Sequence, residues 1–155
     1  MYAAEVMDPN PTTLKATDTI ECAANYIMDK RYRNMPVIDE NHRYVGMFGV
    51  NCLLRQMIPR SVLTHKGLEN VGFIHETLDD LYRRFDEVKH QPISVCMGPD
   101  IQPVNPDTPL VETMLQLYET RSSIPVVDKN NRLLGMISYW DIGEKVLAAE
   151  AHRNA

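Results

Sequence analysis

The spacing of apolar positions predicts two amphipathic helices that lie far apart in the chain. Between residues 20 and 28, and again between residues 110 and 117, apolar side chains recur every three or four positions. This spacing gathers them on one helical face, which we expect to pack against a core. The faces consist of Ile20, Ala23, Ala24, Ile27 and Met28 in the first segment and of Leu110, Met114 and Leu117 in the second.

Each predicted helix is followed by two short apolar runs with a polar turn between them. Such runs around Asp and Asn residues are typical of β-hairpins, and a proline at the first position of a strand removes no essential hydrogen bond. A further helix is expected after each hairpin, from about Val50 and from about Tyr139. The apolar runs are residues 36–38 and 44–48 in the first half of the chain and 125–127 and 133–137 in the second.

These elements occur in two copies. The segment Met35-Pro36-Val37-Ile38-Asp39 is matched by Ile124-Pro125-Val126-Val127-Asp128, with an offset of 89 residues from position 35 to position 124. The dipeptides Gly46-Met47 and Gly135-Met136 keep the same offset. Identities in a constant register indicate an internal duplication, so we predict two units of about 55 residues each.

The duplication divides the chain into four parts. They are a first unit at residues 1–62, an inter-repeat segment at 63–91, a second unit at 92–150 and a tail at 151–155 that is expected to fray. Residues 66–74 contain two glycines and are expected to form a loop, and residues 76–90 are expected to form a helix with one charged side. This helix either covers the join between the units or binds a partner.

The composition narrows the class of protein. A chain of 155 residues with 44% hydrophobic content is large enough for a globular core. The net charge of −5 disfavours binding along nucleic acid or an anionic membrane, and no apolar run is long enough to span a bilayer. The N-terminus lacks a signal-peptide pattern, so a soluble cytoplasmic protein is expected. The three separated cysteines indicate buried free thiols rather than disulfides or a zinc site.

The sequence contains no recognisable catalytic or metal-binding pattern. The five histidines lack the spacing of a metalloprotease helix, and neither a G-x-S-x-G elbow nor a phosphate-binding P-loop occurs. Cys52 stands beside Asn51, with no base assigned to it. We therefore predict a protein that is not an enzyme and that has no metal or obligatory cofactor.

The start of the last predicted helix carries two polar residues at a notable spacing. In Gly135-Met136-Ile137-Ser138-Tyr139-Trp140-Asp141-Ile142, an apolar run ends at a serine, and an aspartate follows three residues later. This S-x-x-D pattern either caps the helix or grips a polar ligand with the carboxylate and the free amides. The first copy has Gly49 and Cys52 in these places, so the fold does not depend on the pair. This difference favours the ligand interpretation.

The signatures MPVID…GMFG and IPVVD…GMISYWDI resemble those of the cystathionine-β-synthase (CBS) domain pair, also called a Bateman module, and the resemblance covers nearly the whole chain. Its most specific part is the pattern Gly-apolar-apolar-Ser/Thr-x-x-Asp, met by Gly135, Ser138 and Asp141. The resemblance implies a mixed α/β fold in which two tandem β-α-β-β-α units pack about a pseudo-two-fold axis, with a helical connection between them. It also implies two clefts between the units and frequent dimerisation.

The resemblance further implies an adenosyl ligand in the inter-unit cleft, namely AMP, ADP, ATP or S-adenosylmethionine. Asp141 would accept hydrogen bonds from both hydroxyls of a ribose, and Ser138 would hold the ribose or a phosphate. Because Gly49 and Cys52 replace this pair, the first site is expected to be empty or altered. The other residues that the resemblance places around the adenine are Gln102, Pro103, Val104, Ser123, Ile124 and Pro125.

Cations and aromatic side chains complete the expected site. Phosphates need positive charge, for which Arg121, Arg33 and Lys89 are the candidates. Tyr139 and Trp140 either stack on the base of the ligand or pack at a dimer face. Restoring serine and aspartate at positions 49 and 52 is expected to add a second binding event if only the sugar anchor is missing.

Two functions of different classes follow. The first is a stand-alone regulatory module, a homodimer that binds an adenosyl ligand and signals by conformational change to a separate effector protein. The second is a ligand-free module that serves dimerisation or interaction alone. The intact Asp141 favours the first function, and Cys52 in the degenerate copy keeps the second open.

Overall fold

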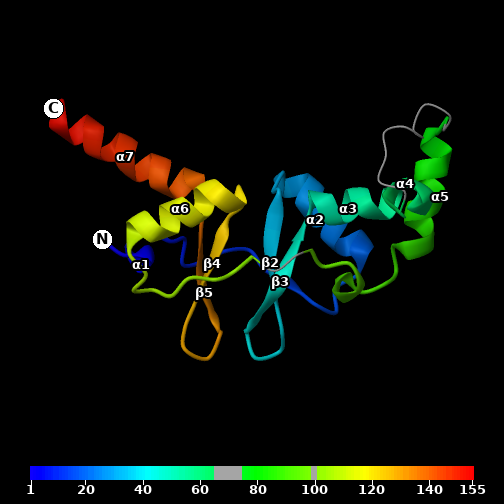
Figure 1. Cartoon of the computed structure of the whole chain (residues 1–155), viewed down its shortest axis with the longest axis horizontal. Coiled ribbons are helices and arrows are strands. Elements are labelled where there is room, and N and C mark those ends of the chain that lie inside the picture. Colours follow the sequence, from blue (N-terminus) through cyan, green and yellow to red (C-terminus); the bar gives the residue numbers. More distant parts are fainter. Residues whose placement is uncertain (65–74, 99–100) are drawn as a thin grey trace.

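The computed structural model describes residues 1–64, 75–98 and 101–155. Figure 1 shows two similar units side by side along the long axis of the molecule, with both termini at the end formed by the second unit. No helix in the described residues is long and apolar enough to cross a lipid bilayer. The loop expected over residues 66–74 lies outside them.

The first unit combines a three-stranded sheet with two helices. Strand β2 lies in the middle, parallel to β1 and antiparallel to β3. Helix α2 connects β1 to β2, and α3 follows β3, so the helix and the hairpin predicted from apolar spacing are confirmed. The elements are β1 (Leu14–Lys15), α2 (Ile20–Lys30), β2 (Asn34–Ile38), β3 (Tyr44–Gly49) and α3 (Val50–Met57).

The second unit repeats this arrangement. Val104 pairs in parallel with Val126, in the place that β1 has beside β2. The fold of two tandem α/β units predicted from the sequence is therefore confirmed, and the last helix includes residues 151–153 of the expected tail. The elements are α6 (Leu110–Thr120), the antiparallel pair β4 (Ile124–Val127) and β5 (Leu133–Ile137), and α7 (Tyr139–Arg153).

Each unit has its own hydrophobic core, and each core includes a segment from the other half of the chain. The short helix α1 (Ala3–Val6) packs its two buried side chains, together with Ile137 of β5, into the core of the second unit. The 3₁₀ helix η2 (Ile93–Val95) places Ile93 in the core of the first unit. The opening segments of the two copies are thus exchanged, and Figure 1 shows α1 beside the second unit.

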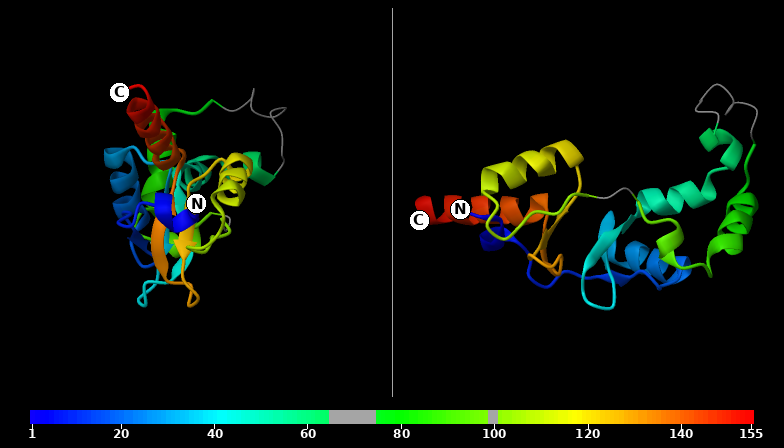
Figure 2. Two further views of the ribbon diagram at one scale, coloured as in Figure 1. Left: turned by 90° about the vertical axis from the view of Figure 1, so that its left-hand side faces the viewer. Right: turned by 60° about the horizontal axis from the view of Figure 1, so that its bottom comes forward.

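The two hairpins meet at the centre of the molecule, as the two further views in Figure 2 also show. Arg43 and Arg132, which are related by the 89-residue offset, form a β-bridge with each other. A buried cluster at this contact contains three residues of each unit related by the same offset, which is the pattern of a pseudo-two-fold axis. These are Ile38, Tyr44 and Met47 with Val127, Leu133 and Met136.

The helix between the copies packs on the first unit rather than across the join. The helix predicted over residues 76–90 is confirmed as α5 (Leu78–Val88), and it contacts α3. Phe85 and Val88 pack against the first core, and Arg84 Nε donates a 2.7 Å hydrogen bond to the Met57 carbonyl. The short helix α4 (Arg60–Thr64) follows α3.

Candidate functional site

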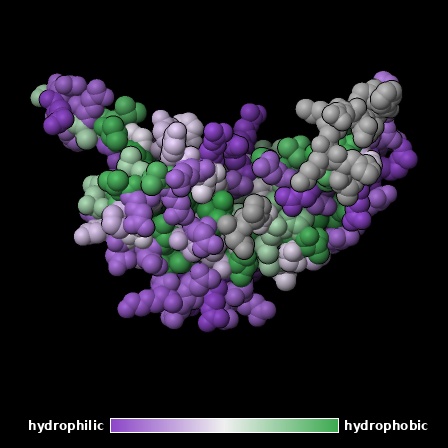
Figure 3. Space-filling view, viewed as in Figure 1, coloured by the Kyte–Doolittle hydropathy of each residue, from purple (hydrophilic) through white to green (hydrophobic). Residues whose placement is uncertain are grey.

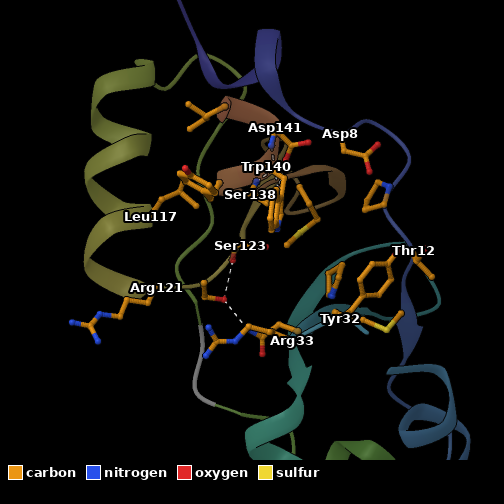
Figure 4. A pocket seen from close by; sticks show the side chains of 18 of the residues that line it. Asp8, Thr12, Tyr32, Arg33, Leu117, Arg121, Ser123, Ser138, Trp140 and Asp141 are labelled. Atoms are coloured by element: carbon orange, nitrogen blue, oxygen red, sulfur yellow. Dashed lines mark hydrogen bonds between the residues drawn. The ribbon is translucent and has the colours of Figure 1, made fainter. Parts of the chain in front are cut away.

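A cleft of about 630 Å³ lies between the two units. Its walls come from the end of α6 and the start of α7, from the loop between α2 and β2, and from the N-terminal segment before β1. In Figure 4, Ser138 and Asp141 lie at one end of the cleft, and Tyr32 and Arg33 lie across from them. The volume is in the range of small-molecule binding sites.

Ser138 and Asp141 bind each other at the start of α7. The Asp141 Oδ2 atom accepts hydrogen bonds from the Ser138 amide at 2.6 Å and from the Ser138 hydroxyl at 2.8 Å. The Ser138 hydroxyl also accepts a longer bond of 3.4 Å from the Asp141 amide, which completes a capping box. Asp141 Oδ1 makes no hydrogen bond with the described residues. The pair therefore caps the helix and still leaves one carboxylate oxygen for a ligand.

The corresponding corner of the first unit is closed. A Cβ atom added to Gly49 would overlap the Arg33 carbonyl and the Asn34 side chain. The Arg33 carbonyl already accepts a 2.9 Å hydrogen bond from the amide of Val50, the first residue of α3. Cys52 is buried in the first core. This copy lacks both the polar pair and the space for it.

Three arginines on the cleft have guanidinium groups without a hydrogen bond or ion pair within the described residues. Arg31 and Arg121 follow α2 and α6 in the left-handed conformation, with φ of 56° and 55°, and Arg33 lies in the loop before β2. The carboxylates on the lining belong to Asp8 and Asp141, so cations outnumber them in a chain whose net charge is −5. A local excess of positive charge with low-dielectric walls favours an anionic ligand.

A match to a family model identifies the kind of protein. The CBS domain model matches residues 3–58 and, a second time, residues 93–147. The chain belongs to the CBS domain family. The two matches cover the two copies, so the molecule is a CBS domain pair, and the resemblance predicted from the sequence is confirmed. No protein of curated function matches the chain in sequence.

Solved structures of CBS pairs share this fold at low sequence identity. CBSX2 from Arabidopsis thaliana matches with a TM-score of 0.74 and 20% identity over 99% of this chain and 98% of that one. CbpB in complex with c-di-AMP gives 0.71 and 15% over 99% and 89%. The CBS pair of MJ0100 in complex with 5′-methylthioadenosine and S-adenosyl-L-methionine gives 0.64 and 15% over 96% and 98%. Such similarity establishes the fold alone.

Half of the residues expected at the CBS ligand site line the cleft. They are Arg121, Ser123, Ser138, Tyr139 and Asp141. Among the described residues, the lining does not include the other half: Gln102, Pro103, Val104, Ile124 and Pro125. Val104, Ile124 and Pro125 are buried, and the Gln102 carbonyl accepts a hydrogen bond from the Gln116 side chain.

Besides the end of α6, which lines the cleft with Met114, Leu117 and Tyr118, two parts of the lining were not predicted as site residues from the sequence. The first is the α2–β2 loop, of which only Arg33 was a candidate cation. The second is the N-terminal segment, where Asp8 and Thr12 reach the cleft because Asp8 is held beside β5 by reciprocal backbone hydrogen bonds of 2.8 and 3.0 Å with Met136. An offset of 90 residues relates Thr12 to Gln102. A repeat pattern does not reveal the exchange of opening segments. Because of the exchange, residues of the first opening segment, rather than those expected from the second, lie beside Ser138 and Asp141.

Aromatic side chains stand at the edge of the cleft. Tyr118 of α6 is 81% exposed, and Tyr139 and Trp140 of α7 are each 74% exposed. The two α7 rings pack edge to face, with centroids 5.9 Å apart and planes at 71°. All three rings are also part of the lining. They are therefore available both to a ligand base and to a second protein surface.

Ionisable side chains outside the cleft have shifted pKa values that arise from local contacts and burial. Lys89, the third candidate cation, lies after α5 and pairs with Asp86 at 2.7 Å, and this hydrogen bond raises the pKa of its ammonium group. Burial, with the nearby Cys52, raises the pKa of the Cys96 thiol to about 11. In the part of the chain that the structure describes, no three His, Cys, Asp or Glu side chains lie close enough to share a metal ion.

Proposed function

We propose that this CBS pair is a regulatory module that binds one adenosyl ligand in the cleft beside Asp141 and signals to a separate effector protein. The Ser138–Asp141 pair carries the proposal, because it borders a cleft of ligand size and has no counterpart in the first copy. Structures of relatives in complex with AMP and with S-adenosyl-L-methionine support the ligand class. We propose that the protein is not an enzyme and that it is cytoplasmic. We expect that it binds neither nucleic acid nor a membrane.

Within this class, the charges favour AMP, ADP or ATP over S-adenosylmethionine. Asp141 Oδ1 is available to a ribose hydroxyl, and the amides at the start of α7 favour negative charge. Arg31, Arg33 and Arg121 supply cations for phosphates. S-adenosylmethionine would instead bring its sulfonium and ammonium charges to the same guanidinium groups.

A ligand-free interaction module is the second candidate. Two observations favour it: the Asp141 carboxylate already serves the helix cap, and wide apolar surfaces of α6 and α7 are exposed. We propose a homodimer under both functions. They differ in whether a small molecule shifts the module between two states, which requires the ligand to bind one state more tightly than the other.

Calorimetric titration with AMP, ADP, ATP and S-adenosylmethionine distinguishes the two functions. We expect the wild type to bind the nucleotides at one site per chain and Asp141→Ala to lose that binding. Asp80→Ala is the matched control, because Asp80 forms the same kind of capping box with Thr77 at the start of α5, outside the cleft lining. Each substitution should lower the free energy of unfolding by about 0.5–2 kcal/mol, but only Asp141→Ala should change binding.

The outcomes separate the parts of the proposal. An absence of heat with all four compounds would favour the ligand-free module. Equal binding by the wild type and Asp141→Ala would reject the site assigned here. Binding of S-adenosylmethionine alone would reject the preference for phosphates and leave the adenosyl site in place.

A further inference from the structure

A second depression lies at the outer end of the first unit, between α3 and α5. This α3–α5 groove has a volume of about 620 Å³, and its lining consists of five apolar residues and one acid. The structure describes all six, and none of them lines the cleft beside Asp141. The groove is therefore separate from the proposed ligand site. The lining residues are Met57 of α3 and Leu78, Asp79, Leu81, Tyr82 and Phe85 of α5.

Two apolar side chains of the α3–α5 groove are largely exposed to solvent. Leu78 is 82% exposed and Tyr82 is 58% exposed. They are four residues apart, so they lie on the same side of the helix. Thr77 and Asp80 cap the start of α5, and Phe85 packs against the first core. Neither the cap nor the core of α5 therefore accounts for Leu78 and Tyr82.

Arg84 holds the two walls of the groove together. Its Nε atom donates a 2.7 Å hydrogen bond to the carbonyl of Met57, the last residue of α3. Its guanidinium group also pairs at 3.0 Å with Glu76, which precedes α5. The groove is thus formed in the protein alone. A preformed groove loses less conformational freedom on binding than one that has to be assembled by its partner.

The surface around the groove is negatively charged. Residues 76–88 contain five acids and two arginines, which gives a net charge of −3. The Asp79 side chain in the lining is 79% exposed and pairs with Arg83 at 3.4 Å. Such exposed pairs contribute little energy, so the carboxylate remains available to a partner. Figure 3 shows hydrophilic side chains along the outer edge of the molecule over α5. The groove therefore favours a partner with basic side chains.

We propose that the α3–α5 groove binds an amphipathic helix with basic side chains, which belongs to the separate effector protein. An apolar groove between two helices accepts the apolar face of a third, whose contacts recur every three or four residues. Exposed Leu78 and Tyr82 contact that face, and the acids around them contact its basic flanks. The inference rests on the proposed function for the existence of an effector, and it adds the surface and the chemistry of the segment that binds there.

Helix α3 connects this groove to the ligand cleft. At the start of α3, the amide of Val50 donates a 2.9 Å hydrogen bond to the carbonyl of Arg33, which lines the cleft. At its end, Met57 lines the α3–α5 groove. A ligand that shifts the loop before β2 therefore also shifts one wall of the groove. By linkage, the bound helix then changes the affinity for nucleotide by the same factor as nucleotide changes the affinity for the helix.

Two synthetic amphipathic peptides test the chemistry of the partner. Both have leucines at helical spacing, and their remaining positions are lysine in one peptide and glutamate in the other. We expect fluorescence anisotropy to show that the lysine peptide binds the full chain and that the glutamate peptide does not. Added salt should weaken the binding of the lysine peptide, because the charges around the groove are exposed to solvent.

The double variant Leu78→Ala, Tyr82→Ala tests the location. We expect it to bind the lysine peptide at least about tenfold more weakly, because it loses both exposed apolar contacts. Its helical circular dichroism should match that of the wild type, since both side chains are exposed and alanine favours helix. Tyr26→Ala is the matched control, because Tyr26 is 40% exposed on α2, outside the groove lining. This variant should bind the peptide like the wild type.

Nucleotide tests the assignment to the effector. We expect saturating AMP or ATP to change the dissociation constant of the lysine peptide about fivefold or more in the wild type. Calorimetric titration of the double variant should give the wild-type affinity for nucleotide, because the groove residues do not line the cleft.

Each outcome supports or overturns a stated part of the proposal. Equal binding of the two peptides, or equal binding of the lysine peptide by the wild type and the double variant, would overturn the groove as a docking surface. A peptide affinity that does not respond to bound nucleotide would overturn its assignment to the effector. A double variant that differs from the wild type in oligomeric state by ultracentrifugation would assign the groove to a second copy of the chain instead. Peptide binding at the groove in a protein that binds no nucleotide would support the surface and reject the proposed ligand.

Discussion

At the scale of single residues, the carbonyl oxygen of Arg33 distinguishes the corner at Gly49 from the corner at Ser138, where we propose that the ligand binds. It binds the amide at the start of α3 and lies where a side chain at position 49 would have to go. We therefore expect that replacing Gly49 and Cys52 by the residues of the second copy does not create a second site. The obstacle comes from the loop before β2, which has three residues between Arg31 and Met35, where the second copy has two between Arg121 and the matching Ile124.

We predict that the double variant Gly49→Ser, Cys52→Asp gains no second binding event and is less stable. Overlap at position 49 should lower the free energy of unfolding by about 1–3 kcal/mol, and a buried aspartate adds to the loss. Urea unfolding and the stoichiometry of nucleotide titration measure the two effects. Gly49→Ala isolates the steric contribution. Two binding events per chain in the double variant would contradict this prediction.

The cysteines should differ sharply in reactivity. The thiolate is the reactive form, and the raised pKa of Cys96, about 11, keeps this thiol protonated near neutral pH. Cys22 is exposed on α2, whereas Cys52 and Cys96 are buried. We predict that iodoacetamide at about pH 8 modifies only Cys22 in the folded protein and all three cysteines in urea, as read by mass spectrometry.

The pH dependence gives this prediction a further test. Modification of Cys96 should accelerate only as the pH rises through about 11, because its thiolate becomes populated there. Cys22→Ser should abolish labelling of the folded protein near neutral pH. Rapid labelling of Cys96 under those conditions would show that burial does not suppress its thiolate.

At the scale of elements, the exchange of α1 and η2 decides which residues belong to which core. We predict that Ile93→Ala lowers the free energy of unfolding by about 2–5 kcal/mol, because it leaves a cavity in the first core. Val95→Ala in the same 3₁₀ helix is the matched control, since Val95 is 58% exposed. It should change stability by about 0.5 kcal/mol or less. Equal losses in the two variants would mean that η2 does not contribute to that core.

The two helices and the hairpin of each unit were predictable from the sequence, because helical and strand spacing are local signals that recur in both copies. The short elements α1, β1, α4 and η2 were not predicted from such spacing. The Ser138–Asp141 pair was predictable from a different signal, namely an S-x-x-D pattern at a helix start that the matching positions in the first copy lack. The exchange of opening segments was not predictable. A pattern of apolar residues such as that of α1 indicates that one face of the helix is buried, but it does not indicate which unit covers that face. The contribution of Asp8 and Thr12 to the cleft depends on that exchange and was missed with it.

At the scale of the whole molecule, three buried clusters connect the units. Two of them are the exchanged cores, and the third joins the hairpins across the pseudo-two-fold axis. We therefore predict a single cooperative thermal transition, with equal calorimetric and van't Hoff enthalpies. Differential scanning calorimetry measures both quantities. Two resolved transitions would show that the units unfold independently despite the exchange.

The exchange also affects the order in which the two hydrophobic cores can form during translation. Val6 is synthesised long before Ile137, which shares its core, and the core of the first unit cannot be complete before Ile93 is made. Contacts between residues so distant in sequence slow folding, because the long loops between them must close before the contacts form. The buried residues of the first core end at Cys96, whereas the second core needs Ile137 as well as Val6. We therefore expect the first unit to reach its native core before the second during synthesis.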